Sequence, residues 1–278
     1  MAAVLTPIFL SPVDTYENVD LNRGSFNDIT GRKRIEVSDA VQGRSAVILI
    51  LGQSNGANSG STPYTPKRRV FNFNLFDGFC YVAQDPLLGA TETRGSFGSR
   101  LGDKLIDSGH WDTVVLAPIS IGGSRIEEWT TGGVRHRRLQ VAIQRAADSG
   151  LAFTHVLWHQ GESNARSDAD GDAYVECFLN IHAALRGYGV SAPIYVAQAT
   201  ICNSPSCEPI RRAQGAVVNP ELGILSGPDT DLIGPDERFD GCHMNERGLE
   251  RHADMWLKVL LGEKTGRRPR ATECPATR

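Results

Sequence analysis

The sequence has no long apolar run and no excess of charge of either sign. No stretch of its 278 residues approaches 18 consecutive apolar residues, the length needed to cross a membrane as a helix. The 29 Lys and Arg nearly balance the 32 Asp and Glu, which gives a net charge of -3. Such a chain lacks the basic surface that binds nucleic acids or anionic membranes. We expect no membrane span and no nucleic acid partner; oligomeric state cannot be read from composition.

Cysteine is scarce, and its spacing does not suit a zinc site. The six cysteines are Cys80, Cys177, Cys202, Cys207, Cys242 and Cys274. No second Cys or His pair with zinc-finger spacing accompanies Cys202 and Cys207. Because a turn-rich Asn-Ser-Pro-Ser loop separates these two, the sequence predicts a disulfide between them. A disulfide favours an oxidising compartment, that is, secretion or the periplasm. Unpaired thiols in a cytoplasmic enzyme are the alternative.

Alternating strand and helix patterns predict an α/β fold. Short apolar runs typical of strands occur at residues 46–51, 113–117, 154–158, 193–198 and 222–226. Apolar residues at helical spacing occur within 97–106, 139–147, 174–185, 211–218 and 249–260. Strands that alternate with helices form a parallel sheet covered on both faces. We therefore expect a three-layer α/β/α sandwich around a five-stranded parallel sheet.

The chain divides into one domain and two flanking segments. Residues 46–263 carry the alternating pattern and form a single domain. Its 57–93 segment is a long insertion, expected on the side of the site because long loops in compact domains usually serve one. Residues 1–45 are a leading segment packed on the domain, without the basic stretch or cleavage site of a signal peptide. Residues 264–278 lack apolar periodicity and are expected to be mobile.

A serine follows the first predicted strand directly. The apolar run 46–51 ends in the sequence GQSNG, in which the serine is Ser54. In open α/β sheets, ligands bind at the turns that follow the strands. Flanking glycines let a substrate approach the backbone closely, so Ser54 is a candidate nucleophile. On these residues alone, a serine that caps the next helix is an equal alternative.

A carboxylate and an imidazole stand three residues apart before the last predicted helix. In a turn, Asp240 and His243 project to the same side. The carboxylate then accepts a hydrogen bond from one ring nitrogen, while the other nitrogen faces the site. Acyl transfer by a serine needs such an oriented base. An aspartate that caps the helix beside an unrelated histidine is the alternative.

Two other strand ends carry groups able to stabilise negative charge. Gly122 and Gly123 follow the second strand, where paired glycines can aim a backbone N–H at an oxyanion. A tight turn is the alternative. Gln160 and Glu162 follow the third strand. The Gln160 amide can donate to the same oxyanion, while Glu162 orients that amide or binds substrate hydroxyls.

All these groups belong to one edge of the predicted sheet, which favours an enzyme over separate structural roles. The ends of the first three strands and the start of the last helix meet there. A metal centre that includes His155 and His159 is not expected. These residues are four apart on a strand, and therefore about 13 Å apart.

Together these residues resemble the SGNH hydrolase superfamily. The similar branch contains sialate O-acetylesterase-like domains and the acetylxylan esterases of carbohydrate esterase family six. It carries GQSN, HQGE and DxxH blocks in this order, and here they stand at 52–55, 159–162 and 240–243. The α/β-hydrolase fold shares the G-x-S-x-G pattern. In that fold, however, several strands precede the serine, and acid and base come from separate loops.

The resemblance implies a flavodoxin-like fold and a role for each residue. Ser54 is the nucleophile, His243 the base and Asp240 the residue that orients it. The oxyanion hole consists of the N–H groups of Ser54 and Gly123 and the side-chain amide of Gln160. Substrate-binding or supporting residues are Gln53, Asn55, Gly122, Glu162 and, from its position, Arg125. The family needs no metal or organic cofactor.

The predicted reaction removes acetyl groups from an acetylated sugar or polysaccharide through an acyl-serine. The alternatives are a short-chain carboxylesterase or lipase-like SGNH hydrolase, a carbohydrate O-acetyltransferase, and a non-catalytic sugar-binding domain. Aromatic residues of the 57–93 insertion either form platforms for sugar rings or fold the insertion onto the domain. They are Tyr64, Phe71, Phe73, Phe76 and Tyr81.

Overall fold

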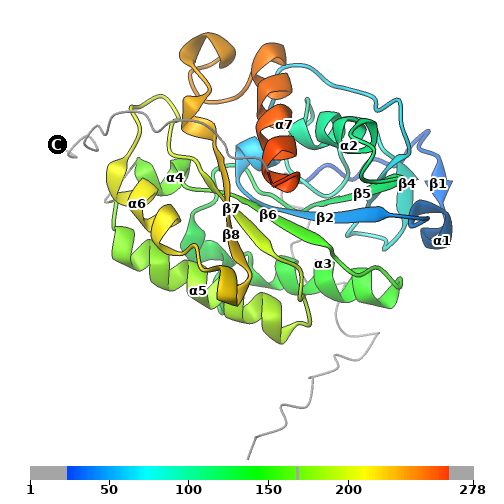
Figure 1. Ribbon diagram of the computed structural model, residues 1–278, viewed down its shortest axis with the longest axis horizontal. Helices are drawn as coiled ribbons and strands as arrows, with labels where there is room; N and C mark the ends of the chain where they lie inside the picture. The colour runs from blue at the N-terminus through cyan, green and yellow to red at the C-terminus, as the bar shows by residue number, and fades with distance from the viewer. Residues whose placement is uncertain (1–23, 167–168, 263–278) are drawn as a thin grey trace, which may run out of the picture.

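A single sheet of eight strands runs through the part of the chain that the computed structural model describes, residues 24–166 and 169–262 (Figure 1). Its strand order is β1-β4-β3-β5-β2-β6-β7-β8. From β3 to β8 the neighbours pair in parallel, whereas β4 is antiparallel to β3 and to β1. The strands are β1 (Arg34–Ile35), β2 (Ser45–Gly52), β3 (Val70–Phe73), β4 (Cys80–Val82), β5 (Thr113–Pro118), β6 (His155–His159), β7 (Ile194–Gln198) and β8 (Ile224–Asp229).

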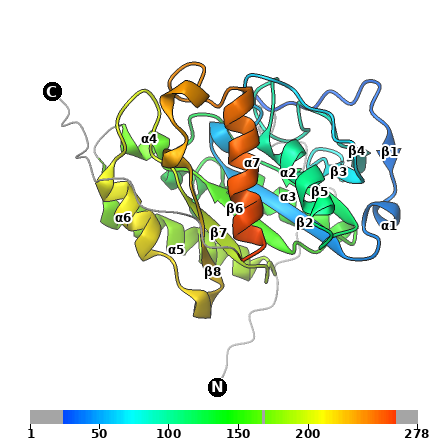
Figure 2. The same cartoon turned by 45° about the horizontal axis from the view of Figure 1, so that its top comes forward.

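Helices cover both faces of this sheet, which confirms the predicted three-layer sandwich (Figures 1 and 2). One face carries α2 (Phe97–Asp107) and α7 (Glu246–Leu260). The other carries α3 (His136–Asp148), α5 (Gly171–Gly187) and α6 (Glu208–Ala216). The shorter helices are α1 (Val37–Ala40), α4 (Glu162–Ala165), η1 (Ser54–Gly56), η2 (Ile126–Trp129), η3 (Pro220–Leu222), η4 (Thr230–Leu232) and η5 (Pro235–Glu237). None of the helices in the described ranges is long and apolar enough to span a bilayer.

The strand β2 lies in the middle of the core, and this explains its unbroken apolar sequence. Residues 46–51 are at most 2% exposed, because helices cover both sides of the strand. Their side chains alternate between two apolar clusters, one on each face of the sheet. Each large side chain buried in this way contributes roughly 1.5–3 kcal/mol to folding. The strand end that carries Ser54 is therefore rigidly placed.

The five predicted strands are all present, but the sheet extends further than expected. The 57–93 insertion supplies β3 and β4, which add to the sheet beyond β5. Its aromatics Phe71, Phe73 and Tyr81 are at most 7% exposed, and the Tyr64 hydroxyl donates to Asp103 Oδ2 at 2.8 Å. Phe76 is partly buried and packs against the same core. Of the two interpretations of these aromatics, the structure therefore favours the one in which they fold the insertion onto the domain. Pairing with β3 also protects β5 from being an open edge.

The predicted disulfide between Cys202 and Cys207 is wrong. Cys202 is bonded to Cys242 instead, 40 residues further along the chain. The reason is the local backbone: Cys207 caps α6 and is fully buried, with its N–H donating to Thr200 Oγ1 at 3.0 Å. Cys207 takes part in a different disulfide. Cys202 lies in the loop after β7 and faces the loop that precedes α7. The predicted mobile tail, 264–278, lies outside the described residues.

Candidate active site

Ser54 lies at the carboxyl end of β2 and begins the short helix η1. Two residues earlier, Gly52 has a φ of 139°, and a Cβ atom there would clash with the carbonyl oxygen of His159 on β6. Only glycine therefore lets the two strands end so close together. Among the described residues, neither the N–H nor the hydroxyl of Ser54 has a hydrogen-bond partner. Both groups are available for chemistry.

Asp240 and His243 form the hydrogen-bonded pair that their spacing predicts. Asp240 Oδ2 lies 2.7 Å from His243 Nδ1. The other carboxylate oxygen accepts the backbone N–H groups of His243 at 2.7 Å and of Cys242 at 2.9 Å. Partial burial opposes ionisation of Asp240, but these bonds outweigh it and lower the pKa of the carboxyl. His243 Nε2 has no partner in the described residues, so it is the free nitrogen of an oriented base.

The side chain of Asn55 connects the serine segment to the segment that carries Asp240 and His243. Its Nδ2 donates to the carbonyl oxygen of Cys242 at 3.3 Å and to Glu162 Oε1 at 2.9 Å. Within the described ranges, no hydrogen bond joins Ser54 Oγ to His243 Nε2. Catalytic hydrogen bonds are commonly long without substrate and shorten in the complex. The structure thus brings the predicted nucleophile and base to the same edge of the sheet.

Of the two glycines after β5, Gly122 lies beside Ser54, but only Gly123 has an uncommitted amide. A Cβ atom placed on Gly122 would lie 3.8 Å from Ser54 Cβ. The N–H of Gly122 donates to Thr91 Oγ1 at 2.7 Å. Gly123 has a φ of 72° and open space around it, and its N–H donates to nothing in the described part of the chain. This arrangement favours Gly123 as the oxyanion donor.

Gln160 does not point toward an oxyanion in this structure, contrary to the sequence-based expectation. The residue is fully buried. Its Nε2 donates to Asn164 Oδ1 at 2.6 Å, to the Ser124 carbonyl at 3.2 Å and to Gln53 Oε1 at 3.3 Å. Gln53 Oε1 also accepts the N–H of Ser163 at 3.0 Å. Gln53 and Gln160 therefore fasten the ends of β2 and β6 together beneath the site.

Glu162 neither orients Gln160 nor reaches a substrate. It is 1% exposed, and its Oε1 lies 3.1 Å from His159 Nε2. Burial opposes ionisation, but the His159 ring and the Asn55 amide outweigh it and lower the pKa of Glu162 to about 2. His159 in turn packs edge-on against the buried ring of His252 on α7, with ring centroids 4.9 Å apart. Glu162 is a buried charge that supports Asn55.

An exposed aromatic ring lies beside the His243 ring. The Phe239 ring is 42% exposed, and its centroid lies 6.1 Å from that of His243. The Arg94 guanidinium lies 5.3 Å from the Phe239 ring centroid. Glu92 has a φ of 70°, which is uncommon outside glycine and is concentrated at functional sites. Arg125, a predicted substrate-binding residue, has its Nη2 3.0 Å from Glu127 Oε1.

Sequence reasoning missed two residues that shape the site. Cys242 lies inside the DxxH block, yet its bond to Cys202 depends on a distant segment. Arg238 is buried and donates from Nη1 to the Cys242 carbonyl at 2.5 Å. An arginine at the start of a polar loop gives no indication of burial. The cysteine within the block was the one available clue.

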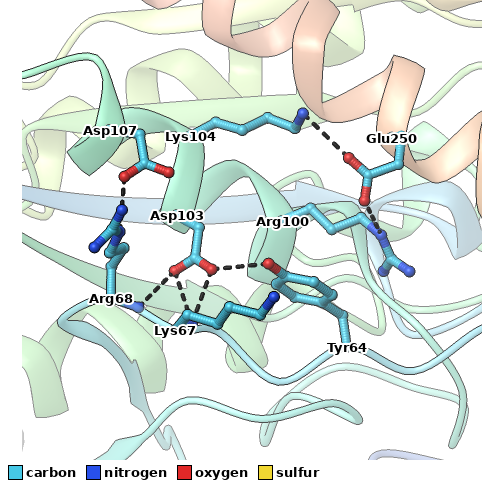
Figure 3. Close-up of a pocket in the computed structure, with 8 residues that line it drawn as sticks. All are labelled: Tyr64, Lys67, Arg68, Arg100, Asp103, Lys104, Asp107 and Glu250. Atoms are coloured by element: carbon cyan, nitrogen blue, oxygen red, sulfur yellow. Dashed lines mark hydrogen bonds and ion pairs between the residues drawn. The ribbon is translucent and has the colours of Figure 1, made fainter.

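A separate pocket of about 370 Å³ lies between α2, α7 and the 60s loop (Figure 3). It contains none of the predicted catalytic residues. Its charges pair with one another: Arg68 with Asp107 at 2.7 Å, and Lys104 with Glu250 at 3.1 Å. The Asp103 carboxylate accepts a hydrogen bond from the Tyr64 hydroxyl. Across the described ranges, no three His, Cys, Asp or Glu side chains gather as metal ligands.

Comparisons with known proteins identify the family of this chain and agree with its fold. Residues 44–260 match the family model described as "Carbohydrate esterase, sialic acid-specific acetylesterase". The search of curated proteins finds no match. A solved structure of a protein from Arabidopsis thaliana has a TM-score of 0.65 at 16% identity, covering 79% of this chain and 99% of that one.

Two further solved structures are similar. NanS has a TM-score of 0.54 at 14% identity, with 79% of this chain and 97% of that chain covered. A variant of Axe2, an acetyl xylan esterase from Geobacillus stearothermophilus, has a TM-score of 0.52 at 12% identity, with 81% and 99% covered. At such low identities these likenesses bear on the fold, and they agree with the three-layer sandwich.

Proposed function

Because this chain belongs to the carbohydrate esterase family of sialic acid-specific acetylesterases, we propose that Ser54, His243 and Asp240 remove acetyl groups from sugars by acyl transfer. The chain is a carboxylic ester hydrolase. The observation that carries these residue roles is the 2.7 Å bond between Asp240 and His243 Nδ1, which leaves Nε2 free at the sheet edge of Ser54.

The reaction has two steps. His243 Nε2 takes the Ser54 proton as Oγ attacks the acetyl carbonyl carbon. The N–H groups of Ser54 and Gly123 stabilise the oxyanion, each by roughly 3 kcal/mol in the transition state. The bond from the carbonyl carbon to the sugar oxygen breaks, and that oxygen takes the proton from His243. Water, deprotonated by His243, then attacks the carbonyl carbon of the acetyl-serine. The bond from that carbon to Ser54 Oγ breaks, Oγ takes the proton back from His243, and acetate leaves.

The substrate is an acetylated sugar or polysaccharide, and its sugar part packs against Phe239. This ring supports the proposal because it is the large exposed apolar group beside His243. Aromatic faces provide apolar contact area for the C–H surface of a sugar ring. Arg94, which lies over the same ring, adds hydrogen-bond donors for sugar oxygens.

Acetate release from acetylated xylo-oligosaccharides and O-acetylated sialic acid tests this function, together with the 4-nitrophenyl esters of acetate, butyrate and octanoate. We expect activity on acetyl esters that falls with chain length, and a loss of roughly 10⁶-fold in kcat for Ser54→Ala. Ser59→Ala is the matched control, because its buried hydroxyl has no partner in the described residues. Activity that rises with chain length indicates a lipase-like enzyme, and transfer to added glycans in preference to water indicates an acetyltransferase.

We also infer that the protein works in an oxidising compartment, outside the cell or in the periplasm. The Cys202–Cys242 disulfide supports this, since cytoplasmic reductants keep most thiols reduced. Alkylation of thiols in intact cells, followed by peptide mass spectrometry, should leave both cysteines unmodified. Alkylation of both in freshly lysed cells would contradict the inference.

A further inference from the structure

Cys242 connects four parts of the site through its backbone and side chain. Its N–H donates to Asp240 Oδ1 at 2.9 Å. Its carbonyl oxygen accepts from Asn55 Nδ2 at 3.3 Å and from Arg238 Nη1 at 2.5 Å. Its sulfur is bonded to Cys202. One residue thus contacts Asn55 next to the nucleophile, the Asp240 carboxylate, the buried Arg238 and the loop after β7.

The loop that carries Cys202 is itself firmly anchored. Thr200, two residues earlier, is fully buried, and its N–H and hydroxyl donate to Asp231 at 2.8 and 2.6 Å. One residue after the disulfide, the N–H of Asn203 donates to the Gly241 carbonyl at 3.0 Å. The disulfide therefore attaches the Asp240–His243 turn to a fixed point at the end of β7.

The two functional side chains of the turn are themselves only partly buried, although Cys242 between them is buried. The side chains of His243 and Asp240 are 26% and 39% exposed. Apolar packing holds the neighbouring Met244 in the core, whereas the Asp240 and His243 side chains depend on polar contacts and on the attachment at Cys242. A general base must stay within hydrogen-bond reach of the serine hydroxyl that it deprotonates, and a displacement of 1 Å can cost roughly a hundredfold in rate.

We propose that the Cys202–Cys242 disulfide is a positioning element of the esterase. It holds the Asp240–His243 turn where His243 Nε2 reaches Ser54 Oγ, so turnover depends on the oxidation state of this one bond. The proposal rests on the function proposed above. A dithiol reductant supplies two electrons and two protons, leaving two protein thiols and its own cyclic disulfide. The turn then keeps its hydrogen bonds but loses its covalent attachment.

The full-length oxidised protein, the dithiothreitol-treated protein and a Cys202→Ser/Cys242→Ser double variant are compared on 4-nitrophenyl acetate. We expect kcat of the double variant to fall roughly tenfold to a hundredfold, with KM within about twofold. Dithiothreitol should lower the wild type similarly, have no further effect on the double variant, and be reversed by oxidised glutathione. Cys177→Ser is the matched control, because Cys177 is a free thiol.

Two further measurements keep the result interpretable. Circular dichroism establishes that each sample is folded. If the double variant does not fold, partial reduction of the wild type replaces it. Alkylation and peptide mass spectrometry then show whether activity is lost together with the Cys202–Cys242 bond or with the disulfide of Cys207.

A folded double variant with wild-type kcat overturns the proposal. So does a loss of activity that accompanies alkylation of Cys207 while the Cys202–Cys242 bond is intact. An oxidised wild type with no esterase activity instead contradicts the proposed function, so the two failures are distinguishable.

Discussion

Ser54 follows a strand whose residues 46–51 are at most 2% exposed, whereas His243 and Asp240 stand in a turn with 26% and 39% of their side chains exposed. The sheet core positions the nucleophile, and its neighbours Gln53 and Gln160 are buried as well. The base is positioned by hydrogen bonds and one disulfide. Substitutions beneath Ser54 should therefore lower stability first, and substitutions in the turn should lower turnover first.

The largest effect on turnover that sharpens this contrast is expected for Asp240→Asn. The amide cannot hold the His243 ring in the same tautomer or stabilise its positive charge, and in serine proteases the equivalent change costs about 10⁴-fold in kcat. Because Asp240 is partly exposed, the melting temperature should change by only a few degrees. Asp236→Asn, an exposed acid in the same loop, is the control. An unaltered kcat for Asp240→Asn would remove this residue from the mechanism.

On the buried side, Glu162→Gln should lower the free energy of unfolding by about 3 kcal/mol at neutral pH, since it removes a buried carboxylate whose Oε1 lies within hydrogen-bond distance of His159 Nε2 and Asn55 Nδ2. Its folded-state pKa of about 2 lies below the unfolded value of about 4.3. The stabilisation is therefore present above the unfolded value and is lost as pH falls through the folded one. Urea unfolding should show that the difference in the free energy of unfolding between the wild type and Glu162→Gln becomes smaller from pH 7 to pH 3. A difference that stays constant over this range would refute the charge effect.

A smaller effect is expected for Gly123→Ala. Its φ of 72° strains any side chain, and relaxation turns the N–H away from the oxyanion. We expect kcat to fall roughly tenfold, less than the loss of a complete oxyanion donor. Gly132→Ala is matched, with a φ of 87° and open space around it, but it lies away from Ser54. Equal kcat values for the two variants would exclude the Gly123 amide.

Local patterns predicted the parts of the site that local sequence determines. The apolar run before Ser54 and the spacing of three between Asp240 and His243 each fix a short-range geometry, and both are present. The strands β3 and β4 were missed because these short aromatic segments become strands only by pairing: β3 pairs with β5, far along the chain, and β4 pairs with β3 and β1.

Long-range contacts explain the remaining errors. The orientation of Gln160 depends on acceptors contributed by three other positions, which no pattern around Gln160 reveals. The partner of Cys202 depends on two loops meeting across 40 residues. Sequence spacing favoured Cys207 as the partner of Cys202, whereas the fold places Cys242 against Cys202.

Covalent labelling of the nucleophile tests the central claim most directly. A fluorophosphonate, which reacts with activated serines, is added to the wild type and to His243→Ala, and the adduct is located by peptide mass spectrometry. We predict a single adduct on Ser54 in the wild type and almost none in His243→Ala. Labelling of another residue, or equal labelling of Ser54 in both proteins, would contradict a Ser54 nucleophile activated by His243.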